Sequence, residues 1–313
     1  MKTPSILRTV RQLKRWRSRL GSDTDAVAVV VGTFHILQPG NLAALQRARK
    51  CARHVCVILE NDTAGRAGDG RPVISLAERA EMVAGLKDVD AVASFSTRDA
   101  ARCLASLQPF NLIHCDKHDD GPIEKRTMVS TDNLVRIPAI RGCFTSDILR
   151  SIRDGDTPLR LPAGYSAARR PAAAKARKGR LITVNGCFDV LHIGHLRFLM
   201  KAAAFGDRLI VLINDDNSVR RYKGASRPVF PLPFRIAALM ALKPVSAVRP
   251  FAADNPLRLL AGLKPAVHIK GGSYEPERVE DERNLLRKWG GRVAFCPMVE
   301  GRSTSNYLRK VAS

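Results

Sequence analysis

Two histidines, His192 and His195, are the side chains of this sequence best suited to phosphate chemistry. They follow a short β-branched apolar run, residues 181–184, and a glycine, Gly186, that favours a sharp turn. The pattern predicts a strand, a turn and then a helix start, where free N–H groups and the helix dipole favour an anion. Side chains three residues apart on a helix share one face. Both imidazoles could therefore donate hydrogen bonds to a phosphoryl group whose charge grows during transfer.

Two other interpretations of this pair compete with catalysis. Paired histidines can simply pack in a core, and histidine is also a zinc ligand, but the sequence offers no third and fourth ligand at a metal-binding spacing. A second polar group is better explained as the end of a strand than as a metal cluster: His114, Cys115, Asp116 and His118. We therefore expect no metal site built from protein side chains.

An internal repeat indicates which elements position the histidines. Five segments of the first half recur in the same order in the second half, about 153 to 159 residues later. The matching segments are residues 31–41 and 185–195, 61–62 and 214–215, 71–73 and 227–229, Arg79 and Arg235, and 145–150 and 304–309. Strand and helix patterns alternate in both halves, which favours parallel sheets covered by helices. The sequence thus predicts an α/β fold of two tandem Rossmann-like, doubly wound domains, residues 22–153 and 180–313.

Most of the net charge lies at the borders of these domains. Fourteen of the 23 net positive charges fall in residues 1–20 and 160–180, which contain no acidic residue. We expect a basic helix or tail over residues 1–21 and a basic linker over residues 154–179. The charge attracts anions in general, but no nucleic-acid-binding motif accompanies it. We therefore expect no specific nucleic-acid partner.

Hydropathy and cysteine usage indicate the compartment. No run of 18 apolar residues occurs, and basic residues interrupt the early apolar positions, so neither a membrane span nor a signal peptide is expected. The seven cysteines are scattered without a CxxC pair, which is typical of reduced thiols. These features predict a cytoplasmic protein.

The segment around the histidines resembles a known signature. Residues 185–195, Asn-Gly-Cys-Phe-Asp-Val-Leu-His-Ile-Gly-His, are similar to the motif of the HIGH-type cytidylyltransferase-like nucleotidyltransferases. A longer series resembles the D-glycero-β-D-manno-heptose 1-phosphate adenylyltransferase module of ADP-heptose synthases: residues 206–211, 214–215, 223–229, 269–274 and 301–306. The resemblance spans nearly all of residues 181–312.

The resemblance implies a role for each matching residue. His192, His195 and Lys223 would be catalytic, and Lys223 would reach the α-phosphate or the incoming sugar phosphate. The nucleotide would be bound by a larger set: Gly186, Cys187, Phe188, Asp189, Gly194, Lys270, Gly271, Gly272, Ser303, Thr304 and Ser305. Within this set Asp189 would shape the turn or touch the acceptor, and Lys270 would lie over the nucleotide.

Three further residues qualify this assignment. Arg235 would either reach a phosphate or lie on a solvated helix face. Ser273 stands where the family usually has an acidic residue, and Ser305 where it usually has a second threonine. The first departure leaves the preference for base and acceptor open. Mg²⁺ is expected together with ATP, because the substrate is a nucleoside triphosphate.

The first copy lacks this chemistry. Gln38 and Asn41 stand where the second copy has His192 and His195, and no lysine stands in the segment that would match the catalytic lysine. An amide can donate a hydrogen bond but cannot carry the charge of an imidazolium. We interpret the first copy as a pseudo-catalytic domain, in which nucleotide binding stays an open question. By analogy with related transferases, an internal pseudo-dimer and a homodimer are both open arrangements.

One function is preferred over two alternatives. The preferred function is transfer of AMP from ATP to a sugar 1-phosphate, with heptose 1-phosphate as the best candidate, giving ADP-heptose and pyrophosphate. The first alternative is a cytidylyltransferase that acts on glycerol phosphate or an amino-alcohol phosphate. The second is a regulatory or scaffolding protein without activity. The second copy's histidines and lysines argue against the last of these.

Overall fold

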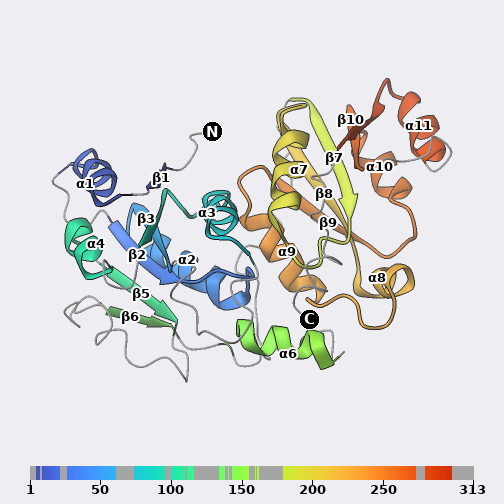
Figure 1. Ribbon diagram of the computed structural model, residues 1–313. Coiled ribbons are helices and arrows are strands. Elements are labelled where there is room, and N and C mark those ends of the chain that lie inside the picture. The colour runs from blue at the N-terminus through green and yellow to red at the C-terminus, as the bar shows by residue number, and fades with distance from the viewer. Residues whose placement is uncertain are drawn as a thin grey trace. The chain divides into compact units, whose positions relative to one another are not determined.

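The chain forms two compact units, Met1–Thr145 and Ser146–Ser313 (Figure 1). The computed structural model describes residues 5–7, 9–21, 27–60, 74–95, 100–109, 111–115, 134–137, 140, 143–154, 159, 161, 179–272 and 279–297. Most of the predicted linker, residues 154–179, lies outside these ranges. Leu159, which is described, is buried and donates its backbone N–H to Val229 O at 2.9 Å. The chain after the first unit is therefore anchored to the second unit at this residue.

The second unit contains a five-stranded sheet in which neighbouring strands are parallel. Its strands are β7 (Leu181–Gly186), β8 (Arg208–Asn214), β9 (Ala247–Phe251), β10 (Val267–Gly271) and β11 (Arg292–Cys296). Their spatial order is β11-β10-β7-β8-β9. The chain therefore runs outward from β7 to β9 and then returns to the other side of β7. The switch point between β7 and β10 is where ligands bind in open sheets of this kind, outside the carboxyl ends of the strands.

The first unit repeats this layout. Its strands are β2 (Val27–Gly32), β3 (His54–Glu60), β4 (Ala91–Phe95), β5 (Asn111–Cys115) and β6 (Leu134–Ile137). They lie in the order β4-β3-β2-β5-β6. The second sheet has the same order when it is written from β9 to β11, so that β2 corresponds to β7 and β5 to β10. One further strand of the first unit pairs with β4. The predicted fold of two Rossmann-like parallel-sheet units is confirmed.

Helices connect the strands in both units, as crossovers between parallel strands require. In the first unit they are α2 (Pro39–Cys51), α3 (Leu76–Ala84) and α4 (Ala100–Leu107). Helix α6 (Thr145–Asp154) begins at the border of the two units. In the second unit they are α7 (Ile193–Ala203), α8 (Asp216–Lys223), α9 (Leu232–Ala241), α10 (Leu257–Leu263) and α11 (Glu280–Arg287). Within the described part of the chain, no helix is long and apolar enough to cross a membrane.

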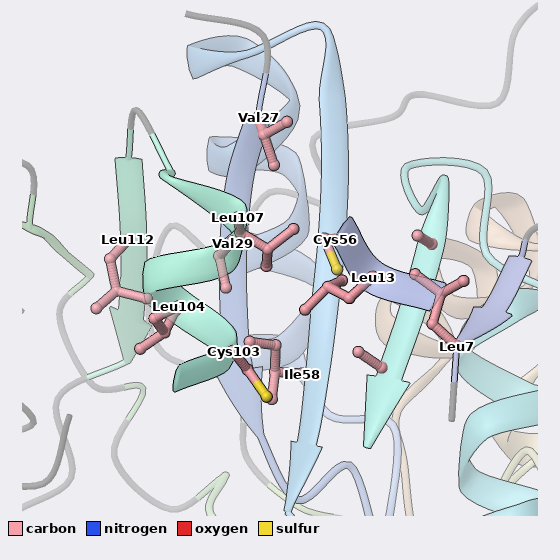
Figure 2. Packing of buried hydrophobic residues seen from close by; sticks show 12 residues of the cluster. Leu7, Leu13, Val27, Val29, Cys56, Ile58, Cys103, Leu104, Leu107 and Leu112 are labelled. Atoms are coloured by element: carbon pink, nitrogen blue, oxygen red, sulfur yellow. The ribbon is translucent and has the colours of Figure 1, made fainter. Parts of the chain in front are cut away.

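The N-terminal segment is part of the first unit, whereas the sequence suggested a separate helix or tail. Residues Ser5–Leu7 form strand β1, which pairs with β4, and Val10–Ser18 form helix α1, which packs against α4. Figure 2 shows Leu7 and Leu13 in the same buried cluster as Cys56 and Leu107. Leu13 is fully buried. The apolar face of α1 is therefore covered by the unit's own core, and Arg11, Lys14 and Arg15 are exposed. Arg17 is partly buried and donates from Nε to Leu107 O at 3.0 Å.

Candidate active site

The histidine pair lies where the sequence places it, at the start of the helix that follows β7. Helix α7 begins at Ile193, and His192 is its N-cap residue with an extended backbone. The two imidazole rings are stacked, with centroids 3.8 Å apart and planes inclined by 27°. Both side chains therefore lie together at a helix N-terminus on the carboxyl edge of the sheet, where the backbone favours a bound anion.

The surroundings of His195 favour its neutral form. Burial, reinforced by the neighbouring His192, lowers the pKa of His195 well below its ordinary value. The ring of His195 also contacts the ring of Phe188, with centroids 5.3 Å apart. The sequence pattern suggested a role for the charge of an imidazolium. The lowered pKa of His195 instead favours a neutral imidazole that donates through N–H, and a bound triphosphate would favour its protonation.

The turn before the pair is built differently from the sequence-based expectation. The residue with a left-handed backbone is Phe188, with φ of 44°, and not Gly186. Glycine is required at 186 for space, because a Cβ atom there would lie 3.1 Å from the Phe188 ring. A positive φ in an aromatic residue is strained and has to be held by its surroundings.

Asp189 supplies part of that support. Its buried carboxylate accepts hydrogen bonds from the backbone N–H groups of Val229 (2.9 Å) and Phe230 (3.0 Å). It also pairs with Arg227, whose Nε lies 2.7 Å from Oδ2. Of the two roles considered for Asp189, the geometry supports shaping the turn. The carboxylate ties the turn after β7 to the segment before α9.

Arg235 supports the same region through its hydrogen bonds. This role differs from both roles considered for it. The side chain is fully buried, so it does not lie on a solvated face, and its donors are engaged within the protein. It donates to the carbonyl oxygens of Phe230 (3.0 Å), Cys187 (2.7 Å) and Asn214 (2.9 Å). It also pairs with Asp216, the first residue of α8, at 2.6 Å. Arg235 thus joins the ends of β7 and β8 to the segment before α9.

The first unit keeps the equivalent scaffold. Phe34 has a φ of 51°, and a Cβ atom on Gly32 would lie 3.1 Å from its ring. The buried Arg79 donates to the carbonyl oxygens of Thr33 (2.6 Å) and Glu60 (3.0 Å). Glu60 therefore occupies the place of Asn214, one residue earlier than the match of residues 61–62 with 214–215 suggested.

At the start of α2 the first unit has amides in place of imidazoles. Gln38 is the N-cap residue of α2, and its backbone N–H donates to Asn41 Oδ1 at 3.2 Å. Pro39 follows at the first helical position, which removes one of the N–H groups that a phosphate would use. The polar groups of this helix start thus serve the helix itself.

The predicted lysines lie in contrasting environments. Lys223 is the exposed last residue of α8. Burial raises the pKa of the Cys187 thiol, and the positive charge of Lys223 opposes that shift, so Lys223 acts electrostatically on the turn after β7. Lys270, by contrast, is buried at the end of β10 with its charge paired inside the protein. Gly271 and Gly272 follow it, and Gly272 has a φ of 98°. The predicted phosphate ligands Ser303, Thr304 and Ser305 lie outside the described residues.

A ladder of buried polar groups between β7 and β10 was not predicted. His268 Nδ1 lies 2.8 Å from Thr183 Oγ1. Two residues further along each strand, Lys270 Nζ lies 3.0 Å from Asn185 Oδ1 and 2.7 Å from Glu282 Oε1 of α11. These side chains project from one face of the sheet, because alternate residues of a strand share a face. We call these five residues the polar ladder. The Asn185–Lys270 end of the polar ladder lies at the carboxyl edge of the sheet, beside Gly186.

The polar ladder makes stability depend on pH. Burial, reinforced by the charge of Lys270, lowers the pKa of His268 to about 3. In the unfolded chain a histidine takes up a proton near pH 6.5, so acid favours unfolding below that pH. We expect His268 alone to lower the free energy of unfolding by about 2 kcal/mol between pH 7 and pH 5. Denaturant unfolding of the wild type and of the double variant Thr183→Val/His268→Leu at both pH values measures this contribution. An equal loss in both proteins would show that His268 takes up its proton in the folded state.

Among the described residues, no three His, Cys, Asp or Glu side chains lie close enough together to hold a metal ion. The carboxylates nearest the histidines are engaged with Arg227 and Arg235. A divalent cation would therefore enter with a triphosphate, whose oxygens are its natural ligands.

The fold and this edge together define the class of protein. A parallel sheet with a switch point, a helix start at that point and two stacked imidazoles are the features of an α/β nucleotide-binding protein. The cytidylyltransferase-like family model matches residues 29–136 and 183–305, one segment in each unit. The chain belongs to the cytidylyltransferase-like family and is a nucleotidyltransferase.

The chain is also similar to individual proteins. The bifunctional protein HldE of Geotalea uraniireducens (strain Rf4) is 48% identical over 139 residues, which are 44% of this chain and 28% of that protein. The bifunctional protein HldE of Coxiella burnetii (strain RSA 493 / Nine Mile phase I) is 43% identical over 140 residues, 45% of this chain and 29% of that protein. A crystal structure of the lipopolysaccharide core biosynthesis protein from Thermoplasma volcanium GSS1 is 24% identical, covers 39% of this chain and 98% of that one, and has a TM-score of 0.34. The chain thus spans less than a third of the length of these HldE relatives.

Proposed function

We propose that the second unit transfers AMP from ATP to a sugar 1-phosphate, with heptose 1-phosphate as the preferred acceptor and ADP-heptose and pyrophosphate as products. The observation that carries this proposal is the stacked pair of His192 and His195 at the start of α7. The similarity to HldE proteins supports the choice of acceptor. The seven cysteines are scattered through the sequence without a CxxC pair, which suits a reducing compartment, and we place the enzyme in the cytoplasm.

The proposed reaction is an in-line displacement at phosphorus. An oxygen of the acceptor phosphate forms a bond to the α-phosphorus of ATP, while the bond from that phosphorus to the bridging oxygen breaks. The electron pair of the broken bond leaves with pyrophosphate. Catalysis of such a transfer rests on positioning and on stabilising the charge of the phosphoryl oxygens. Mg²⁺ bound to the triphosphate would neutralise part of its charge.

Each residue of the edge has a defined part in this scheme. His192 and His195 donate N–H groups to phosphoryl oxygens, beside the free N–H groups at the start of α7. Lys223 reaches the phosphates from the end of α8, where its side chain is exposed. Asp189 and Arg235 hold the backbone that carries these groups. Ser303, Thr304 and Ser305 would complete the phosphate contacts.

The first unit would not catalyse the reaction. Its helix start has Gln38 and Asn41 in the histidine positions, and Asn41 is engaged as a cap. We therefore propose one active site per chain, in residues 180–313, with residues 22–153 as a pseudo-catalytic domain. This assignment predicts that substitutions at Gln38 leave turnover unchanged.

A pyrophosphate-release screen tests the proposal. The full chain is incubated with ATP, CTP, GTP or UTP and with heptose 1-phosphate, other sugar 1-phosphates, glycerol phosphate or ethanolamine phosphate, and pyrophosphate is measured. We expect release with ATP and heptose 1-phosphate to exceed every other combination. Preference for CTP with an alcohol phosphate would replace the proposed substrate with that of the cytidylyltransferase alternative. No release with any pair would favour a non-catalytic role.

A further inference from the structure

The two sheets differ at the position of the Thr183–His268 pair of the polar ladder. Thr183 is the third residue of β7 and pairs in register with His268 of β10. The third residue of β2 is Val29, which pairs in register with Leu112 of β5. The side chains of Val29 and Leu112 are buried as completely as those of Thr183 and His268. One fold within one chain therefore accepts an apolar pair at the place where the second unit has a polar one.

The same contrast holds one step closer to the carboxyl edge. Asn185 is the fifth residue of β7, and the fifth residue of β2 is Val31. Scaffold features recur in both units, namely the left-handed phenylalanine and the buried arginine. Because the first unit keeps this scaffold with Val29, Val31 and Leu112 at the described positions, the scaffold does not require the polar side chains of Thr183, Asn185 and His268. A buried ion pair also contributes little net stability compared with apolar packing. The ladder therefore serves the site that the first unit has lost.

The hydrogen bond from Lys270 fixes the orientation of the Asn185 side-chain amide. An ammonium group can only donate hydrogen bonds, so Lys270 Nζ turns Asn185 Oδ1 toward itself at 3.0 Å. The Nδ2 group of Asn185 then lies on the other side of the amide. Within the described part of the chain, Nδ2 has no hydrogen-bond acceptor, and the side chain is only partly buried. Asn185 thus presents two N–H donors at the carboxyl end of β7, directly before Gly186.

Glu282 determines what kind of donor the edge presents. Its carboxylate lies 2.7 Å from Lys270 Nζ, and both side chains are buried. The pair neutralises the lysine and retains it against the sheet, so the charge of Lys270 is engaged within the protein. A fixed, uncharged donor remains at the edge. Such a group suits an oxygen acceptor whose position must be defined closely.

We propose that Asn185 is a further binding residue of this enzyme, that it donates from Nδ2 to an acceptor oxygen of the bound nucleotide, and that Lys270 and Glu282 are positioning residues that hold its amide in that direction. The inference rests on the proposed function, since it places the nucleotide at the carboxyl edge of the second sheet. It assigns the ladder to substrate binding.

Replacement of Asn185 by aspartate separates binding from structure. Aspartate has the same size and still accepts from Lys270, but it has no N–H donor and adds negative charge toward the nucleotide. We expect Asn185→Asp to raise the KM for ATP about ten- to hundredfold, as for a lost hydrogen bond to a charged group, with a smaller change in the KM for the acceptor. Asn185→Val, which copies the first unit, is expected to raise the same KM and to fold. Asn284→Asp on the exposed part of α11 is the matched control and should leave both constants unchanged.

Glu282 is tested by its dependence on Asn185. Glu282→Gln alone is expected to raise the KM for ATP, because the amide loses its fixed direction. In an Asn185→Val background the same change should have no further effect on that KM, although it should still lower thermal stability. Equal effects of Glu282→Gln in both backgrounds would show a purely structural role for Glu282 and overturn this part of the proposal.

Calorimetric binding of a non-hydrolysable ATP analogue to the full chain completes the test. Unchanged affinity in both Asn185 variants, or a rise confined to the KM for the acceptor, would overturn the assignment of Asn185 to the nucleotide. If the wild type binds a triphosphate but does not use ATP and heptose 1-phosphate, the proposed function fails, and the affinities of the variants for that triphosphate still decide the role of Asn185. If the wild type binds no triphosphate, both proposals fail.

Discussion

The double variant His192→Gln/His195→Asn is expected to lose about a thousandfold in kcat while remaining folded. Removal of a single hydrogen-bond donor from a site that stabilises developing charge costs about 10²- to 10³-fold in rate. The substituted residues are those of the first unit, where Gln38 and Asn41 begin a stable helix. Loss of activity would therefore reflect the missing imidazoles and not a disrupted helix. Single-turnover kinetics of AMP transfer at saturating ATP, with thermal unfolding in parallel, measures both quantities.

The single variants define how the two histidines share this role. His192→Gln and His195→Asn should each lower kcat about a hundredfold or more, and their effects should not multiply, because stacked residues that act on one group behave as a unit. Gln38→His/Asn41→His in the first unit is the reciprocal control and should add no activity. Wild-type kcat in the double variant would remove the histidines from the mechanism.

Replacement of Arg235 by methionine is expected to destabilise the second unit by about 3 to 5 kcal/mol. The substitution leaves Asp216 without its cation and leaves the carbonyl oxygens of Phe230, Cys187 and Asn214 without their donor. Loss of one partner of a buried pair carries a penalty of this order. Arg235→Lys should recover only part of the loss, because an ammonium cannot span three carbonyl groups and a carboxylate in the guanidinium geometry.

Arg79→Met is the matched variant for this prediction. It removes the equivalent guanidinium from the first unit, where the carbonyl oxygens of Thr33 and Glu60 accept from it. Denaturant unfolding followed by probes in each unit should show the loss in the first unit for Arg79→Met and in the second unit for Arg235→Met. An unchanged free energy of unfolding in the Arg235 variant would mean that water replaces the guanidinium without penalty.

The internal repeat carried most of the structural information in the sequence. The match of residues 31–41 with residues 185–195 predicted that each unit begins with a strand, a turn and a helix, and both units have these elements. The three-residue spacing of His192 and His195 also predicted that their side chains lie on one face of the helix start, and their rings are stacked. Such features follow from local geometry, because the period of a helix or strand determines which neighbours share a face.

The local sequence pattern does not indicate contacts between distant segments of the chain. Thr183 and His268 are 85 residues apart, and nothing in the local pattern of either strand indicates its partner. The pairing of Lys270 with Glu282 was not predicted either, because it depends on how α11 covers the sheet. Strand β1 is only three residues long, too short for an alternating pattern to reveal it. These features arise from tertiary packing, which overrides local preference.

The arginine shared by both units also bears on how related sequences should be interpreted. Arg79 and Arg235 hold equivalent backbone carbonyl groups, although only one of them lies in the unit with the pair of histidines. A lineage that loses catalysis would still lose stability if it replaced this arginine. An arginine at this position in another chain is thus a marker of architecture, and it gives no information on whether that chain is an enzyme.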